Sequence, residues 1–303
     1  MKDAGAEVAS VHLAVAPRSP SLLADYLALT KPRLNFLVVA TSAAGYYLGA
    51  PGAPDLWPMA NAVAGTALVA GGAAVLNQVA ERETDALMRR TRMRPLPDGR
   101  LPPSDARIFG LVLAGAGLAL LASRANLAAA SLALATLVVY LLVYTPMKRR
   151  SPVATLIGAV PGALPGLIGW TASHGSVSRG GGALFAIVFL WQIPHFMAIA
   201  WLYRDDYGKA GFPMLPVIEP AGRRAGRQAL IYAAALVPTS LVPAVVGVSG
   251  WMYLPIALML GAWLFWLALR FAAARGDTAA RHLFVGSIVY LPLIWIAMMY
   301  CKR

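Results

Sequence analysis

Nine apolar runs of membrane-spanning length dominate the chain and constrain its fold more than any other feature. They cover residues 34–50, 58–79, 107–123, 127–145, 153–172, 183–203, 227–248, 251–271 and 281–300. An α-helix needs about 20 predominantly apolar residues to cross the hydrocarbon core of a bilayer. Because lipid offers the backbone no hydrogen-bond partner, such runs must form helices. With charged residues at 13% and a mean hydropathy of +0.64, the sequence excludes an ordinary soluble domain. It predicts an all-α polytopic membrane protein with nine transmembrane helices around a central cavity.

Lysine and arginine residues are distributed unequally between the two sides that nine spans define. The N-terminal segment and the loops after the second, fourth, sixth and eighth spans hold 22 of the 26 basic residues. Segments rich in lysine and arginine lie on the cytoplasmic side of membrane proteins. We therefore predict a cytoplasmic N-terminus and a C-terminus outside. Since the net charge of +13 follows this topology, it predicts no nucleic-acid partner.

The sequence indicates one membrane domain preceded by a short polar tail. Residues 1–20 mix charged side chains with only a short apolar stretch, which predicts a disordered cytoplasmic tail and no cleavable signal peptide. Residues 21–303 are expected to form a single transmembrane domain. Two long loops, at about residues 82–106 and 204–226, each follow an even-numbered span. We expect both loops to cap the central cavity from the cytoplasmic side.

Three chelating side chains, Asn77, Glu81 and Asp85, stand four residues apart where the second span ends. Four residues advance a helix by about 6 Å and rotate it only about 40° past a full turn, so the three point the same way. Polar groups at membrane depth are costly and are commonly functional. Their oxygen donors suit Mg²⁺, which takes one or two carboxylates together with substrate phosphates. We predict a metal site here, with acids that pair with Arg82 and Arg89 at a solvated helix end as the alternative.

A second acidic segment, containing Asp205 and Asp206, directly follows the sixth span. Metal ions that bridge a diphosphate need ligands from opposing sides, so we expect this segment to complete the site. Basic side chains near both segments supply charge for phosphate oxygens, arginine as a planar fork and lysine as a point charge. The predicted diphosphate contacts are Lys31, Arg33, Arg92, Arg94, Lys148 and Arg149. For the last two, a role as a topology signal stays open.

The fifth and sixth spans contain interruptions that are unusual for simple apolar helices. Gly158, Gly162 and Gly166 stand at four-residue spacing, which predicts close helix packing. In the sixth span, Pro194 can kink the helix, and His195 is the one histidine inside an apolar run away from both ends. A buried histidine is often a hydrogen-bonded structural residue, but histidine is also a common axial ligand of haem iron. Both roles stay open at this point.

Five segments, in order, resemble the protohaem IX farnesyltransferase (haem O synthase) family of the UbiA-type intramembrane aromatic prenyltransferases. The resemblance runs from about Thr30 to the last span and is carried by residues 77–99, 144–149, 158–170, 191–196 and 203–216. Glu81 stands where many members of the wider superfamily have aspartate. Tyr203 and Tyr207 stand where the second acidic motif is expected, with Asp205 and Asp206 between them. Of these two acids we favour Asp206 as the metal ligand.

The resemblance implies transfer of farnesyl from farnesyl diphosphate to a vinyl group of haem B, with addition of water, giving haem O and diphosphate. It implies Mg²⁺ as cofactor, haem as a substrate and a location among the lipids of the cell inner membrane. It implies catalytic roles for Glu81, Asp85 and Asp206, haem contact by His195, and metal ligation by Asn77, Glu81, Asp85, Asp205 and Asp206. Haem A synthase and terminal oxidase assembly factors are the candidate protein partners. A prenyltransferase for another aromatic acceptor, such as 4-hydroxybenzoate, and a transporter of haem or a phosphorylated lipid are the alternatives.

Overall fold

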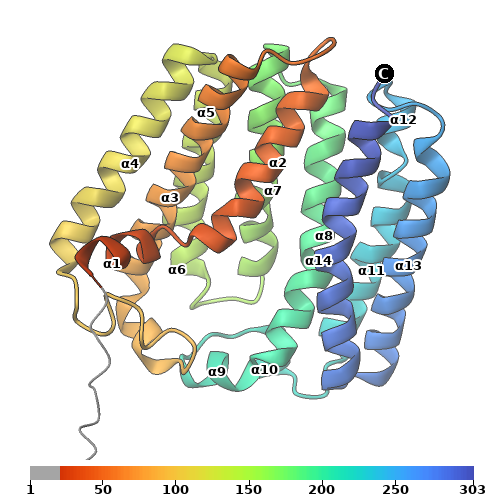
Figure 1. Ribbon diagram of the computed structural model, residues 1–303. Helices are drawn as coiled ribbons and strands as arrows, with labels where there is room; N and C mark the ends of the chain where they lie inside the picture. The colour runs from red at the N-terminus through yellow and green to blue at the C-terminus, as the bar shows by residue number, and fades with distance from the viewer. Residues whose placement is uncertain (1–20) are drawn as a thin grey trace, which may run out of the picture.

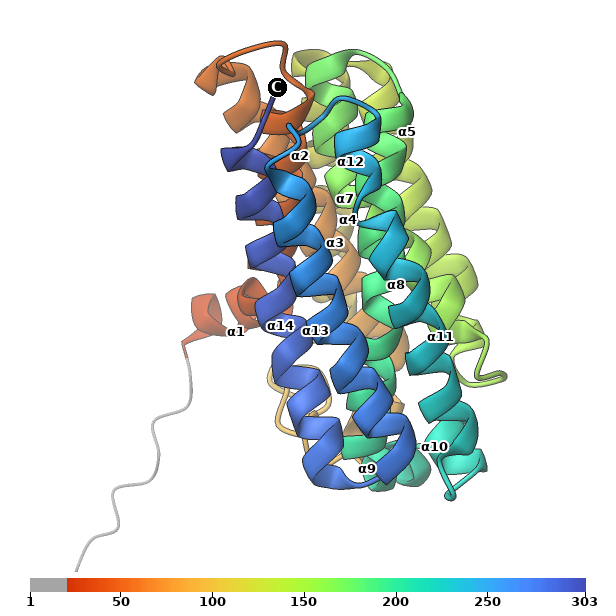
Figure 2. The ribbon, with the colours of Figure 1, turned by 90° about the vertical axis from the view of Figure 1, so that its right-hand side faces the viewer.

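A computed structural model describes residues 21–303, which form a bundle of long helices standing side by side (Figure 1; Figure 2). Eight helices in this part of the chain are long and apolar enough to cross a membrane by length and composition. Within residues 21–303, β-structure is limited to one isolated bridge between Ser249 and Lys302. The prediction of an all-α polytopic membrane protein is confirmed. The eight spans are Leu56–Leu87, Pro103–Arg124, Leu127–Met147, Ala154–His174, Arg179–Leu202, Arg223–Val245, Tyr253–Ala274 and Asp277–Tyr300.

Six of these spans are single α-helices and two are composite. The single helices are α3 (Leu56–Leu87), α4 (Pro103–Arg124), α7 (Ala154–His174), α8 (Arg179–Leu202), α13 (Tyr253–Ala274) and α14 (Asp277–Tyr300). The first composite span joins α5 (Leu127–Val138), a π-helical segment (Val139–Tyr144) and α6 (Thr145–Met147). The second joins α11 (Arg223–Thr239) and α12 (Val242–Val245).

The first predicted span, residues 34–50, forms α2 (Pro32–Gly49), which lies in the bundle against α7 (Figure 1). It is 18 residues long and is not among the eight helices that are apolar enough to count as spans. The nine predicted runs therefore correspond to nine helical segments of the described chain. The contact between α2 and α7 is close, since a Cβ at Gly45 would overlap the backbone of Gly166. The predicted close packing of the fifth span is confirmed at this position.

Helix α7 lies between two buried apolar clusters that hold the bundle together. Leu164 and Ile168 pack with side chains from α2 to α5, including Leu121. Ala163 and Trp170, on the same helix, belong to the larger cluster formed with α8, α11, α13 and α14. Because α7 packs on both sides, it fixes the position of α2 to α5 relative to α8, α11, α13 and α14.

A short helix that the sequence reading did not anticipate, α1 (Leu22–Leu29), lies across the bundle rather than along it (Figure 1; Figure 2). Leu22, Leu23 and Leu27 are exposed, while Leu29 and Asp25 are buried. An exposed apolar face on a crosswise helix is typical of a segment in the membrane interface. The predicted disordered tail, residues 1–20, falls outside the described residues.

The two predicted acidic loops lie at the same end of the bundle (Figure 1). Residues 88–102, α9 (Arg204–Lys209) and α10 (Leu215–Ile218) gather there, next to the ends of α3 and α8. The C-terminus and α12 lie at the opposite end. We call the end that holds the two loops the acidic end.

Candidate active site

The last turns of α3 carry the predicted polar stripe, Asn77, Glu81 and Asp85, into the interior of the bundle. These residues are 3%, 5% and 2% exposed, respectively. Helix α3 has 32 residues, about 48 Å of helix, which is more than the hydrocarbon core requires. Its last turns therefore extend beyond the apolar run without leaving the protein. Because buried carboxylates need compensating positive charge, other segments must supply it.

Asn77, the deepest member of the stripe, is held at both ends of its amide. Its Nδ2 donates to Thr145 Oγ1 at 3.2 Å, and its Oδ1 accepts from Lys31 Nζ at 3.4 Å. Thr145 directly follows the π-helical segment, and its hydroxyl donates to the Tyr140 carbonyl at 2.8 Å. Single π-helical turns occur frequently at functional sites. Here the segment ends at the residue that contacts the stripe.

Lys148 forms a buried ion pair with Glu81. Its Nζ lies 3.2 Å from each carboxylate oxygen, and its side chain is only 14% exposed. The same Nζ lies 4.6 Å from the centre of the Phe212 ring, on the segment after α9. A lysine that served only as a topology signal would be solvated. Its burial against Glu81 and Phe212 instead supports a role in the site.

Asp85 pairs with Arg94, from the loop that follows α3. Arg94 donates from a terminal guanidinium nitrogen to Asp85 Oδ2 at 2.7 Å. The Thr91 hydroxyl donates to the Asp85 carbonyl, also at 2.7 Å, and so stabilises the turn that brings Arg94 back over the helix end. Arg82 pairs with the exposed Glu83. The alternative had the acids pairing with Arg82 and Arg89 at a solvated helix end. In the described chain Glu81 and Asp85 are instead buried and pair with Lys148 and Arg94.

Lys31 enters the site from the junction between α1 and α2. Its backbone has the left-handed φ of 50°, a conformation that side chains other than glycine seldom adopt. Burial, reinforced by the Arg94 charge, lowers the pKa of Lys31 to about 8. Of the predicted cationic contacts, the structure brings Lys31, Arg94 and Lys148 to the stripe and leaves Arg33, Arg92 and Arg149 exposed.

Two contacts that stabilise the acidic end were not predicted from the sequence. Arg100 Nε lies 3.1 Å from both carboxylate oxygens of Asp25, and Asp25 is 4% exposed. Gln78 donates from Nε2 to the Leu29 carbonyl at 2.6 Å. Together they tie α1 and the loop after α3 to the helix that carries the stripe. The available signal was a single carboxylate, Asp25, in an otherwise apolar segment.

The second acidic segment reaches the same end, but its carboxylates stay apart from the stripe. In α9, Asp205 is exposed and Asp206 is half-buried. Across residues 21–303, no three His, Cys, Asp or Glu side chains come together in a group that could hold a metal ion. The two loops meet instead through a buried apolar cluster of Met88, Tyr207, Ala210 and Phe212.

An arginine joins the two loops at the positions where acids were expected. The Arg90 guanidinium lies 5.0 Å from the centre of the Tyr203 ring and 5.8 Å from that of Tyr207. Both distances are within the range of cation–π attraction. The tyrosines that replace the second acidic pair therefore contact the cationic run after α3.

His195 lies deeper in the bundle than the acidic end, eight residues before Tyr203 in the chain, which is about 12 Å of helix. Its half-buried ring stacks on Trp191 and Phe284, with centroids 5.1 and 5.2 Å away. Its Nδ1 lies 2.8 Å from Ser287 Oγ on α14. Pro194 lies within α8, which continues as one α-helix past it.

Comparison with known proteins places the fold in a family. Residues 38–295 match the model of the UbiA prenyltransferase family. The chain belongs to this family. A protein named protoheme IX farnesyltransferase from Solibacter usitatus is 46% identical, over 91% of this chain and 97% of the relative. One of the same name from Koribacter versatilis is 45% identical, over 93% and 94%.

Solved structures of UbiA-type proteins share the architecture at low sequence identity. A structure of digeranylgeranylglyceryl phosphate synthase aligns with a TM-score of 0.79 at 18% identity, covering 92% of this chain and 98% of that one. A UbiA homologue from Archaeoglobus fulgidus, bound to GPP and Mg²⁺, aligns with a TM-score of 0.66 at 16% identity, covering 90% and 99%. At these identities the likeness supports the fold.

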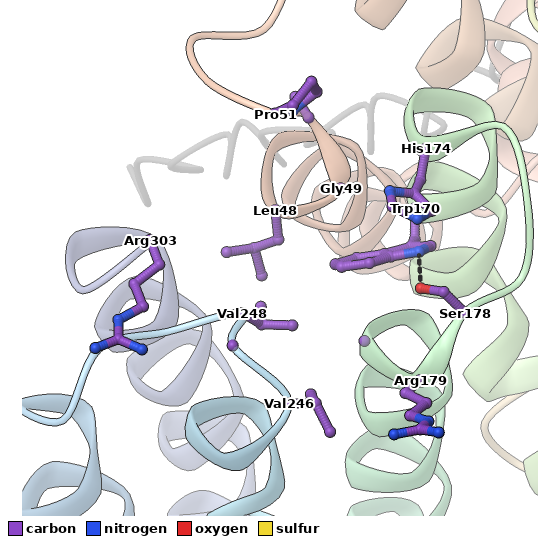
Figure 3. A pocket seen from close by; sticks show the side chains of 13 residues that line it. Leu48, Gly49, Pro51, Trp170, His174, Ser178, Arg179, Val246, Val248 and Arg303 are labelled. Carbon is purple, nitrogen blue, oxygen red and sulfur yellow. Dashed lines mark hydrogen bonds between the residues drawn. The ribbon is translucent and has the colours of Figure 1, made fainter.

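This UbiA-family chain also has a hollow of about 420 Å³ at the end opposite the stripe (Figure 3). Arg179 and Arg303 lie on its rim, and the Trp170 indole at its wall donates to Ser178 Oγ at 3.0 Å (Figure 3). Among the described residues that line it there is no carboxylate side chain. We therefore assign the candidate chemistry to the stripe.

Proposed function

We propose that the protein transfers the farnesyl group of farnesyl diphosphate to a vinyl group of haem B, with addition of water, and so produces haem O and diphosphate. One observation carries this proposal. Buried carboxylates paired with cations lie at the end of the membrane helix α3. The chain that carries them is 46% identical to a relative named protoheme IX farnesyltransferase. The stripe is the proposed binding site for the diphosphate, and the name of the relatives indicates haem as the acceptor.

The donor set of the stripe fits magnesium. Asn77, Glu81 and Asp85 offer only oxygen ligands on one buried helix face, as Mg²⁺ prefers. When bound there, Mg²⁺ neutralises charge on the departing diphosphate. Asp205 and Asp206, at the same end, are the further proposed ligands, with Asp206 favoured.

Cationic side chains around the stripe would hold the diphosphate oxygens directly. Lys31, Arg94 and Lys148 already lie there, each within hydrogen-bond distance of a stripe residue. On substrate binding, Mg²⁺ at the carboxylates and phosphate oxygens at the cations would replace these contacts, so that the charges already stand where the leaving group forms. We assign Arg33, Arg92 and Arg149, which are exposed at the same end, to the approach of the substrate.

The chemistry requires a carbocation to survive until it meets its acceptor. Breaking the bond between the first farnesyl carbon and the diphosphate leaves the electron pair on oxygen and an allylic cation on the chain. The π electrons of the vinyl group then form the new carbon–carbon bond. The resulting cation beside the porphyrin takes a hydroxyl group from water, which releases a proton. Met88, Tyr207 and Phe212, which pack the two loops together, would exclude bulk water from the first cation.

His195 is the proposed contact for haem. His195 lies about 12 Å before Tyr203 along the chain, deeper than Glu81 and Asp85, which lie six and two residues before the end of α3. Its aromatic neighbours Trp191 and Phe284 suit a planar ring. A farnesyl chain with its diphosphate at the stripe and haem at His195 would bring the first farnesyl carbon to the vinyl group.

The protein is a multi-pass membrane protein. We infer that the acidic end faces the cytoplasm in the cell inner membrane, because the loops gathered there hold most of the basic residues. Haem A synthase or terminal oxidase assembly factors would then receive the product within the same membrane.

The decisive experiment incubates the purified protein in lipid nanodiscs with farnesyl diphosphate, haem B and Mg²⁺. We expect haem O by mass spectrometry and one diphosphate released per haem O formed. Diphosphate release with 4-hydroxybenzoate and not with haem would favour a different acceptor. Haem or lipid binding without any diphosphate release would favour the transporter.

A further inference from the structure

Ser287, at the middle of α14, connects two side chains of α8. It is fully buried, and its Oγ lies 2.8 Å from His195 Nδ1 and 2.7 Å from the Phe284 carbonyl oxygen. Its own carbonyl accepts a hydrogen bond from Trp191 Nε1 at 2.7 Å. The serine thus contacts His195 directly and fixes one of the two rings that stack on it.

The two short contacts of the serine hydroxyl determine where the histidine proton lies. A serine hydroxyl carries one hydrogen, and a carbonyl oxygen can only accept. The contact with the Phe284 carbonyl therefore uses the serine proton. Ser287 Oγ must then accept from His195 Nδ1, because the opposite assignment would leave two oxygen acceptors 2.7 Å apart with no proton between them.

We propose that Ser287 is a positioning residue that holds His195 as the Nδ1–H tautomer and leaves the Nε2 lone pair to ligate haem iron. The identity of the ligand rests on the proposed function, whereas the tautomer follows from the contacts alone. Neutral imidazole ligates metals through its bare nitrogen, and a hydrogen bond at the other nitrogen sets the tautomer and raises the basicity of the ligand.

The surroundings of His195 hold the ring in one plane and leave Nε2 free. Trp191 and Phe284 stack on the imidazole with interplanar angles of 20° and 25°. Within residues 21–303, the hydrogen bonding of the imidazole is confined to Nδ1, and the side chain is half-buried. Rotation of the ring by 180° would break the bond to Ser287, so Nε2 keeps one direction.

The first test reads the tautomer in the wild-type protein without any ligand. Solid-state NMR of the full chain in lipid bilayers, with ¹⁵N- and ¹³C-labelled histidine, should show one neutral imidazole whose protonated nitrogen correlates with Cγ. That signal should disappear in His195→Gln. If the signal that disappears in His195→Gln instead has its protonated nitrogen correlated with Cδ2, His195 is the Nε2–H tautomer and the proposal is overturned.

The second test follows haem itself. In Ser287→Ala, which removes the acceptor for Nδ1–H, we expect haem affinity to fall by about tenfold or more and the iron–histidine stretching band of ferrous haem to move to lower frequency. Ser287→Thr, which keeps a hydroxyl, should restore most of both. Ser240→Ala is the matched control, since Ser240 is equally buried and donates to the carbonyl three residues before it but contacts no histidine in the described chain. It should change neither quantity.

The outcomes separate this inference from the proposed function. If His195→Ala loses the haem spectrum while Ser287→Ala keeps it unchanged, His195 binds haem and the role of Ser287 is wrong. If neither substitution changes the spectrum, iron ligation by His195 fails as well. Should Ser287→Ala not fold, the wild-type tautomer still decides the matter.

Discussion

The ammonium of Lys148 lies 3.2 Å from each carboxylate oxygen of Glu81, although the two residues are 67 positions apart in the chain. Because Glu81 and Lys148 are only 6% and 14% exposed, separating them would leave two buried charges unpaired unless a metal ion and a phosphate replaced the lost partners. The pair ties the end of α3 to the end of the span Leu127–Met147. It therefore belongs both to the stability of the bundle and to the candidate site.

Lys148→Met should lower stability, since it leaves Glu81 buried without its partner. Removing one member of a buried ion pair typically costs about 3 to 5 kcal/mol. The double variant Lys148→Met with Glu81→Gln should regain part of this loss but no activity. Thermal unfolding in nanodiscs measures the effect, and Arg150→Met, an exposed change in the same loop, is the control. Equal stability of Lys148→Met and wild type would show that the pair is not formed.

Asp85→Asn should reduce turnover by about 100-fold or more, because an amide cannot balance charge at a metal-bound diphosphate. Glu81→Gln should behave similarly, and Glu81→Asp should be milder because it keeps the charge. Haem O formation at saturating Mg²⁺ is the measurement. Glu83→Gln, an exposed change on the same helix, should retain activity. A folded Asp85→Asn protein with near wild-type turnover would contradict the metal role.

His195→Ala should weaken haem binding and shift the visible spectrum of bound haem, yet leave the affinity for farnesyl diphosphate nearly unchanged. The reason is that the imidazole contacts Ser287, Trp191 and Phe284, and in the described chain it makes no hydrogen bond or ring contact with a stripe residue. Spectral titration with haem and calorimetry with the diphosphate give the two affinities, with the exposed His282→Ala as control. Loss of both affinities in a folded protein would instead indicate a structural role.

The orientation in the membrane can be tested by cysteine labelling in a Cys301→Ser background. Lys209→Cys, on α9, should be shielded from an impermeant thiol reagent in intact cells, and Ser176→Cys, between α7 and α8, should react. Both positions are exposed. Gly222 is unsuitable for a cysteine, because a Cβ there would overlap the Trp201 ring and because its φ is positive. Labelling of Lys209→Cys from outside would reverse the proposed topology.

Local sequence was enough to predict the stripe and the long helices of the bundle, of which eight rather than nine are long and apolar enough to span a membrane. Apolar length alone specifies a membrane helix, and spacing of four alone puts Asn77, Glu81 and Asp85 on one face. Helix α1 escaped prediction because eight residues are too few to show a membrane-length run. The separation of Asp205 and Asp206 from the stripe could not be predicted either, since it depends on how Met88 and Phe212 pack the two loops.

The sequence by itself determined that this protein is a helical membrane bundle with acids and bases concentrated at one end, because hydropathy and helical periodicity act over a few neighbouring residues. Only the tertiary structure decided which partners meet. Lys148 rather than Arg149 reaches Glu81, and Ser287 orients His195 from 92 residues away. Such pairings depend on how helices remote in sequence pack against each other. Shifting a helix by one residue rotates it by about 100°, which would turn a buried contact toward lipid.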